Sequence, residues 1–217
     1  MSVSAILERL RAQRVVPVLR TRERRHAETA ARWLLDAGFS ALEITLTIPD
    51  APSLIRALAA EPNLLVGAGT VPSARDAAAC LAAGARFIVS PWVDPTLAAP
   101  CRAAGAALML GALTPTEVRA GLTAGADVIK IFPASSAGGP RHIRALASVL
   151  PHVAFCPTGG IAPGEVGAYL AAGSAFVGMG GALVDEGRIA AGDRAAILAA
   201  AKAIKDASVP TNACYPR

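Results

Sequence analysis

Lysine is scarce in this chain, although arginine is not. The 217 residues include eighteen arginines but only three lysines, and Lys202 and Lys205 lie near the C-terminus in a segment typical of a surface helix. The third, Lys130, lies inside an apolar, strand-like run over residues 126–133, where a charged amine is costly to bury. Because burial favours the neutral amine, Lys130 is a candidate nucleophile toward a carbonyl group. The alternative is a lysine that falls in a strand by chance.

Aromatic residues, histidine and cysteine are also few. Aromatic residues make up 4% of the chain, and none interleaves with the basic clusters at residues 9–14 and 20–25. We therefore expect a solvated surface there and no nucleic-acid partner, despite the net charge of +5. The three histidines show no paired metal-ligand spacing, so we expect no metal site. Cysteines without CxxC spacing, expected to be reduced and mostly buried, are Cys80, Cys101, Cys156 and Cys214.

Long apolar runs are absent as well. No run reaches the eighteen residues of a membrane span, and the N-terminus lacks the charged-then-apolar layout of a signal peptide. We therefore expect no membrane partner and a cytoplasmic location. No linker or change in composition divides the chain, so residues 1–217 are expected to form one domain.

The chain does contain a regular alternation of β-like runs and alanine-rich helical stretches. Strands are expected at residues 15–20, 41–46, 64–69, 86–90, 107–111, 127–132, 153–158 and 175–179. Glycines suited to left-handed helix ends are Gly38, Gly84, Gly105, Gly125 and Gly173. Eight such units predict an α/β fold, a (β/α)8 TIM barrel, with an extra amphipathic N-terminal helix over residues 1–12. The alternative is a doubly wound open sheet, although its glycine fingerprint is missing after the first strand.

Side-chain alternation places a carboxylate and an amine on inward faces of this barrel. Glu43, Thr45 and Thr47 share one face of the second strand, and Lys130 and Phe132 share one face of the sixth. Strands two and six are opposite each other in an eight-stranded barrel, so Glu43 and Lys130 are expected to face one another across the mouth. An amine with a base in reach suits carbinolamine chemistry. The alternatives are a structural ion pair and, for the second strand, a solvated edge.

Glycine-rich segments follow three of the strands. The third strand ends in Gly-Ala-Gly-Thr, so Thr70 is placed to donate to a carboxylate that the glycines allow to approach. Paired glycines follow the seventh and eighth strands, at Gly159 and Gly160 and at Gly180 and Gly181. Barrel enzymes often bind phosphate at these two turns, through bare backbone N–H groups, so we expect a phosphate group there. The alternative is two tight turns without a ligand.

Four segments together resemble a known family. Glu-Ile-Thr-Leu at 43–46, Gly-Ala-Gly-Thr-Val at 67–71, Lys-Ile-Phe-Pro at 130–133 and Cys-Pro-Thr-Gly-Gly at 156–160 are similar to the signature segments of the 2-keto-3-deoxy-6-phosphogluconate / 4-hydroxy-2-oxoglutarate aldolases. The order and spacing agree over about residues 14–205. The resemblance implies a homotrimeric class I aldolase that needs no metal or cofactor. It would cleave a 2-keto-3-deoxy sugar acid phosphate to pyruvate and glyceraldehyde 3-phosphate.

The resemblance also implies roles for individual residues. Lys130 would form the Schiff base with the C2 ketone of the substrate, and Glu43 would move protons through a water molecule. Thr70 would help to hold the pyruvyl carboxylate. Further substrate contacts would come from Arg20, Thr47, Phe132 and Thr158, and phosphate contacts from Gly159, Gly160, Gly180 and Gly181.

Two departures from the family pattern bear on the substrate. Many phosphogluconate-type members have an arginine where Thr47 stands, whereas phosphogalactonate-type members have a small polar residue there. Gly181 replaces a serine that usually follows the last phosphate turn. Two alternatives stay open: a 4-hydroxy-2-oxoglutarate aldolase that forms pyruvate and glyoxylate, and a catalytically silent barrel that binds a phosphorylated metabolite.

Overall fold

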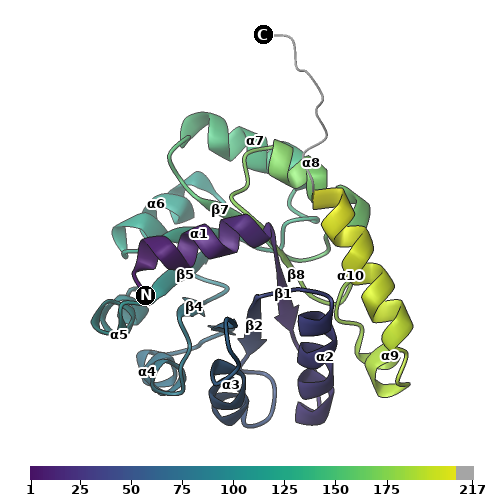
Figure 1. Cartoon of the computed structure of the whole chain (residues 1–217). Helices are drawn as coiled ribbons and strands as arrows, with labels where there is room; N and C mark the ends of the chain where they lie inside the picture. The colour runs from purple at the N-terminus through teal and green to yellow at the C-terminus, as the bar shows by residue number, and fades with distance from the viewer. Residues whose placement is uncertain (209–217) are drawn as a thin grey trace.

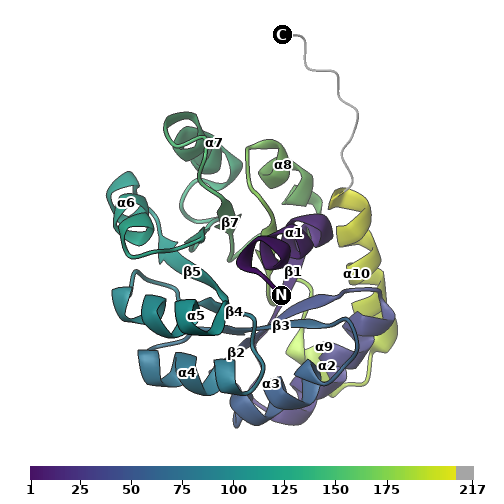
Figure 2. The ribbon, with the colours of Figure 1, turned by 60° about the vertical axis from the view of Figure 1, so that its left-hand side comes forward.

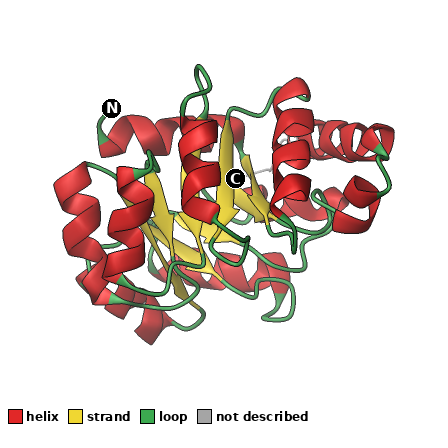
Figure 3. Ribbon diagram, turned by 90° about the horizontal axis from the view of Figure 1, so that it is seen from below, coloured by secondary structure: helices red, strands yellow, loops and turns green. Residues whose placement is uncertain are grey.

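An inner ring of parallel strands surrounded by helices makes up the computed structural model, which describes residues 1–208 (Figure 1, Figure 3). The strands are β1 (Val15–Leu19), β2 (Ala41–Thr45), β3 (Leu65–Gly69), β4 (Phe87–Val89), β5 (Ala107–Ala112), β6 (Val128–Ile131), β7 (Phe155–Pro157) and β8 (Val177–Met179). The α-helices are α1 (Val3–Gln13), α2 (Arg24–Asp36), α3 (Ala51–Ala59), α4 (Ala74–Ala82), α5 (Ala98–Ala104), α6 (Pro115–Thr123), α7 (Gly139–Val149), α8 (Val166–Ala171), α9 (Glu186–Ala190) and α10 (Arg194–Ser208). Two short 3-10 helices are η1 (Pro95–Leu97) and η2 (Pro163–Glu165).

The strands form a barrel rather than an open sheet. Hydrogen-bonded neighbours follow the order β7-β6-β5-β4-β3-β2-β1-β8, and every pair is parallel. Two isolated bridges, Phe155 with Ser174 and Thr158 with Gly178, bring β7 to β8 and complete the ring. The predicted (β/α)8 barrel with an extra N-terminal helix is therefore confirmed, and the doubly wound alternative is wrong.

Local sequence signals marked most element boundaries within a residue or two. The five glycines expected at helix ends all have positive φ angles, from 61° at Gly105 to 110° at Gly84, a region that side chains with a Cβ rarely adopt. The last two strands are shorter than predicted, since regular pairing covers only Phe155–Pro157 and Val177–Met179. Between β7 and β8 the ring is completed by single bridges instead of a continuous ladder.

Alternation along the strands separates two apolar layers. Leu42 and Ile44 of β2, with Ile129 and Ile131 of β6, belong to the layer between the strands and the outer helices. Their sequence neighbours point into the barrel, where Val128 packs in a separate inner cluster. The predicted inward and outward faces of β2 and β6 are therefore confirmed, and the inward faces supply the side chains of the site.

Helix α1 closes the N-terminal end of the barrel, and Figures 1 and 2 show it lying across the ring of strands. Ile6 and Leu10 are four residues apart, so they share one helix face, and both are fully buried. They pack in the inner cluster with the first residues of β2 to β6, among them Leu65 and Phe87. The open end must therefore be the opposite one, where the strands terminate.

The cysteines and the lengths of the apolar segments were both subjects of prediction from the sequence. Cys80, Cys101 and Cys156 are buried free thiols, and burial raises the pKa of Cys101 to about 12. Cys214 lies outside the described residues. None of the helices in residues 1–208 combines the length and the hydropathy needed to cross a lipid bilayer.

Leu10→Ala tests the role of α1 in closing the barrel. We expect the free energy of unfolding to fall by about 2–5 kcal/mol, since the truncation leaves a cavity among fully buried side chains. Urea unfolding followed by circular dichroism measures it. Arg11→Ala, on the exposed face of the same helix, should change stability by less than about 0.5 kcal/mol. Equal effects from the two variants would contradict this packing.

Candidate active site

A cavity of about 620 Å³ opens at the C-terminal ends of the strands. It is bounded by the ends of β1, β6, β7 and β8 and by the loops that follow them. The predicted site residues that line it are Arg20, Lys130, Phe132, Thr158, Gly159, Gly160, Gly180 and Gly181. The remaining three are not among the lining residues but contact them: Glu43 contacts Lys130, and Thr47 and Thr70 contact Arg20. Residues from distant parts of the sequence thus meet in one place.

Lys130, which lines the cavity, and Glu43 beside it form a buried polar pair. The Lys130 Nζ lies 3.8 Å from the Glu43 Oε1, and the two residues are only 4% and 5% exposed. This distance exceeds that of a hydrogen bond, and the same Oε1 has no hydrogen-bond partner within residues 1–208. A buried carboxylate oxygen without a partner is costly. The Glu43 Oε1 and the Lys130 amine can therefore both form hydrogen bonds with a water molecule or with an oxygen-bearing group of a substrate.

Gly69 makes the approach of Glu43 possible. A Cβ at Gly69 would lie 1.9 Å from the Glu43 Oε1, and one at Gly67 would lie 2.1 Å from the Phe87 ring. The sequence predicts that these glycines leave space for the carboxylate of a substrate. In the structure, the space beside Gly67 is filled by the Phe87 ring, and the space beside Gly69 is filled by the Glu43 side chain.

Arg20 is held at the rim by two hydroxyl groups. Its NH2 donates to the Thr70 Oγ1 at 2.8 Å, and its NH1 donates to the Thr47 Oγ1 at 3.5 Å. Thr70 has a φ of 55°, a left-handed conformation that costs a residue with a Cβ about 1 kcal/mol or more. Thr45, predicted on the same strand face as Glu43 and Thr47, is fully buried and donates to the Leu19 carbonyl at 2.9 Å. Only the outer part of this polar face therefore contributes to the mouth.

The paired glycines after β7 and β8 form another part of the cavity wall. Gly159 and Gly160 have φ angles of 98° and 72°, which require glycine. The N–H groups of Gly159, Gly160 and Gly181 donate no backbone hydrogen bond within residues 1–208. Free backbone donors with no side chain in front of them are suited to an anion. This wall can accept a phosphate group at one end of a ligand whose other end reaches Lys130.

Besides Glu43, the groups near the Lys130 amine include a neutral thiol, a hydroxyl and an aromatic ring. Cys156 is paired with Lys130 across β6 and β7, and its burial raises the pKa of the thiol to about 12, so that the thiol stays neutral. Thr158 stands two residues further, with its Oγ1 3.8 Å from the Cys156 Sγ. The Phe132 ring, 41% exposed, lies 5.5 Å from the Lys130 Nζ and forms an apolar side of the cavity.

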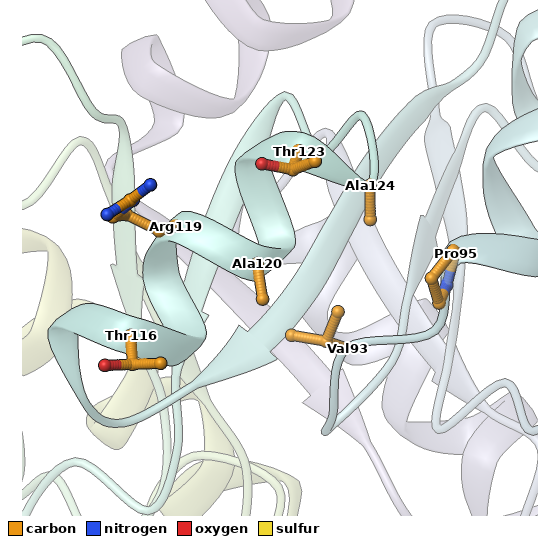
Figure 4. A pocket seen from close by; sticks show the side chains of 7 residues that line it. All are labelled: Val93, Pro95, Thr116, Arg119, Ala120, Thr123 and Ala124. Carbon is orange, nitrogen blue, oxygen red and sulfur yellow. The ribbon is translucent and has the colours of Figure 1, made fainter.

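A second hollow, of about 490 Å³, lies outside the barrel between the loop after β4 and helix α6 (Figure 4). Val93, Ala120 and Ala124 face one another across it, and Arg119 points away at its rim. Among the described residues that line it there is no carboxylate, thiol, imidazole or lysine. It therefore lacks the groups that the cavity at the strand ends brings together. Within residues 1–208, no three His, Cys, Asp or Glu side chains gather as ligands for a metal ion.

Some residues that shape the site were not predicted. Ile161, Ala162 and Pro163 extend the wall beyond the second glycine, and Ala182 extends the turn after β8. Their position directly after the paired glycines could have predicted that they line the cavity. The contact of Gly69 with Glu43 could not be predicted from a local sequence pattern, because it depends on how β2 and β3 are paired.

Gly69→Ala tests the space reserved for Glu43. The added methyl group should displace the Glu43 carboxylate from Lys130 and destabilise the fold by about 1–3 kcal/mol through overpacking. A crystal structure and thermal unfolding of the variant measure the two effects. Gly164→Ala adds a methyl group into open space and should change neither. An unmoved Glu43 in Gly69→Ala would contradict the assignment.

A model of the KDPG and KHG aldolase family matches residues 6–200. The chain is 37% identical to the 2-dehydro-3-deoxy-phosphogluconate aldolase of Pseudoalteromonas atlantica and 37% identical to the KHG/KDPG aldolase of Escherichia coli. Each match covers 82% of this chain and 84% of the relative.

Solved structures agree with the sequence relatives. The chain superposes on a KDPG aldolase from Legionella pneumophila with a TM-score of 0.83 and 34% identity, covering 91% of this chain and 97% of that one. In that structure, pyruvate is captured at low pH as a covalent carbinolamine intermediate. The fold, the family match and these relatives agree, and the chain belongs to the KDPG and KHG aldolase family of lyases.

Proposed function

We propose that this protein is a class I aldolase that cleaves a 2-keto-3-deoxy-6-phospho sugar acid to pyruvate and glyceraldehyde 3-phosphate through a Schiff base on Lys130. The observation that carries the proposal is the buried amine, 3.8 Å from the Glu43 carboxylate, in a cavity whose glycine turns offer free backbone N–H groups. The carbinolamine in the related Legionella pneumophila aldolase supports the same chemistry here.

The reaction begins with the neutral amine of Lys130. Its lone pair adds to the C2 carbonyl carbon of the substrate, the carbonyl oxygen takes up a proton, and loss of water from this carbinolamine leaves a protonated imine. Glu43 is placed to pass the protons of both steps through a water molecule, since its Oε1 faces the amine and has no hydrogen-bond partner within residues 1–208. A phenyl ring and an aliphatic floor restrict water around the pair.

Carbon–carbon cleavage follows from the imine. A base removes the proton of the C4 hydroxyl, the C3–C4 bond breaks, and its electron pair moves toward the imine nitrogen to give an enamine. The C4 fragment leaves as the aldehyde, glyceraldehyde 3-phosphate. Protonation of the enamine at C3 and hydrolysis of the imine release pyruvate and restore the lysine. Glu43 is the carboxylate nearest to the amine and is assigned to these proton transfers.

Two groups of residues suit the two anionic ends of the substrate. Arg20, with Thr47 and Thr70, presents a guanidinium group and hydroxyls at one side of the mouth, where an anionic carboxylate binds favourably. Gly159, Gly160, Gly180 and Gly181 form the wall that would bind the phosphate. Phe132 and Thr158 lie between and would flank the carbon chain.

A 4-hydroxy-2-oxoglutarate aldolase is the second candidate function. It needs the same Lys130 and Glu43, and the absence of a serine at Gly181 removes one hydroxyl donor, worth about 1 kcal/mol, from the phosphate wall. The Escherichia coli relative carries both activities in its name. The ratio of kcat/KM for the phosphorylated and the unphosphorylated keto-acid separates the two candidates, and activity on neither would favour the silent binding barrel. A homotrimeric state and a cytoplasmic location stay predictions.

Lys130→Arg tests the Schiff base. Arginine keeps the positive charge but forms no imine, so we expect pyruvate release, followed with lactate dehydrogenase and NADH, to fall by about 1000-fold or more. Lys202→Arg changes a lysine that lies on the surface and should retain full activity. Cleavage by Lys130→Arg at the wild-type rate would overturn the mechanism.

Glu43→Gln tests the proton transfers. The amide has the shape of the carboxylate but does not act as a base, so kcat should fall by about 10²–10⁴-fold while KM changes by less than about threefold. Steady-state kinetics on the same substrate measure the two parameters. A rise in KM with an unchanged kcat would instead place Glu43 in substrate binding.

A further inference from the structure

Glu186 joins two loops that meet at the rim of the cavity. It lies in the first turn of α9, and its Oε1 accepts a hydrogen bond from the Arg22 backbone N–H at 2.7 Å. The same oxygen lies 3.1 Å from the His26 Nδ1, on the first turn of α2. Helices α2 and α9 lie side by side in Figures 1 and 2. One carboxylate at the start of α9, directly after the loop that follows β8, therefore holds the end of that loop to the loop after β1.

This contact is sheltered from solvent. The side chains of His26 and Glu186 are 13% and 27% exposed. The hydrogen bonds from the His26 ring and from the Arg22 backbone hold the pKa of Glu186 below its ordinary value, so the carboxylate is charged at neutral pH. A sheltered, charged acceptor with two donors fixes its partners more firmly than an exposed ion pair does.

Both joined loops carry residues of the site. Arg20 lies two residues before Arg22, and Gly181 lies five residues before Glu186. Between Arg20 and Arg22, Thr21 is buried, and its hydroxyl donates to the Glu23 carbonyl at 2.8 Å. The first loop is thus fixed by its own hydrogen bonds, and the turn after β8 is tied to it through Glu186.

We propose that Glu186, with His26, is a positioning residue that holds the glycine turn after β8 in the conformation that binds the phosphate group of the substrate. This inference rests on the proposed function, since it takes a phosphorylated ligand as the occupant of that wall. Backbone N–H groups bind an anion well only when their directions are fixed beforehand. The pair makes no contact with Lys130 or Glu43, so it should affect binding of the phosphate end and not the chemistry at the amine.

The test measures binding of 3-phosphoglycerate by isothermal titration calorimetry, which needs no turnover. Glu186→Ala should raise the Kd about tenfold, equivalent to about 1.4 kcal/mol. Glu186→Gln keeps an oxygen that accepts from Arg22 and should recover part of this loss. For cleavage, Glu186→Ala should raise KM for the phosphorylated substrate about tenfold with kcat within twofold, and leave KM for 4-hydroxy-2-oxoglutarate unchanged.

A matched control removes a different carboxylate that ties α2 to the C-terminal helices. Asp36→Ala breaks the 2.9 Å ion pair between Asp36 and Arg194, which touches neither loop, and should leave the Kd unchanged. If Glu186→Ala does not fold, His26→Asn, which keeps a donor near the Nδ1 position, and His26→Gln provide the comparison. We expect His26→Asn to bind more tightly than His26→Gln.

Three results would overturn the inference. An unchanged Kd in a folded Glu186→Ala is the first, and an equal loss in Asp36→Ala is the second. The third is a wild-type protein that cleaves 4-hydroxy-2-oxoglutarate but does not bind 3-phosphoglycerate, which would leave the Schiff-base chemistry intact. A wild-type protein that binds 3-phosphoglycerate but cleaves neither keto-acid would instead overturn the proposed function and leave the inference to be decided by the Kd values.

Discussion

The structure depends on one costly arrangement, a buried amine and a buried carboxylate held 3.8 Å apart inside a parallel barrel. Removing both groups from water carries a large desolvation penalty, and their contact alone is a weak source of stability. Other interactions in the barrel therefore have to offset this desolvation penalty. Gly69 leaves the space that Glu43 fills, and the outer layer that includes Leu42 and Ile129 stabilises the strands that carry the two residues. An arrangement that stability does not favour is most simply explained by chemistry.

The two ends of the barrel differ, since the N-terminal end is packed with apolar side chains and the C-terminal end carries the buried polar pair and the cavity. Helix α1 closes the N-terminal side with Ile6 and Leu10, so that the interior below Lys130 is filled by apolar side chains. At the other side the strand ends bring Arg20, the polar pair and the glycine turns around one cavity. Rigid strands and a filled interior fix the positions of Lys130 and Glu43, and in the proposed function the loops would determine which acid is bound. Membership of the KDPG and KHG aldolase family fits this division.

Much of this organisation is predictable from the sequence, for identifiable physical reasons. Side chains alternate along a strand with a period of two residues, which predicted that Glu43 of β2 and Lys130 of β6 point into the barrel. In a closed barrel of eight strands, the second and sixth strands face each other across the interior. What the sequence did not show depends on distances between strands. The register of β2 against β3 places Gly69 beside Glu43, and the packing of α2 against α9 brings His26 to Glu186, 160 residues away. Neither contact can be predicted from a local sequence pattern, because each joins residues that are distant in the sequence.

The central claim is that the Lys130 amine forms an imine with a keto-acid. Incubation with pyruvate and sodium borohydride, followed by peptide mass mapping, tests it most directly, because reduction converts the imine into a stable secondary amine. We expect a single pyruvyl adduct on the peptide that contains Lys130, with Lys202 and Lys205 unmodified. A folded protein without an adduct, or with the adduct on one of the other two lysines, would contradict it.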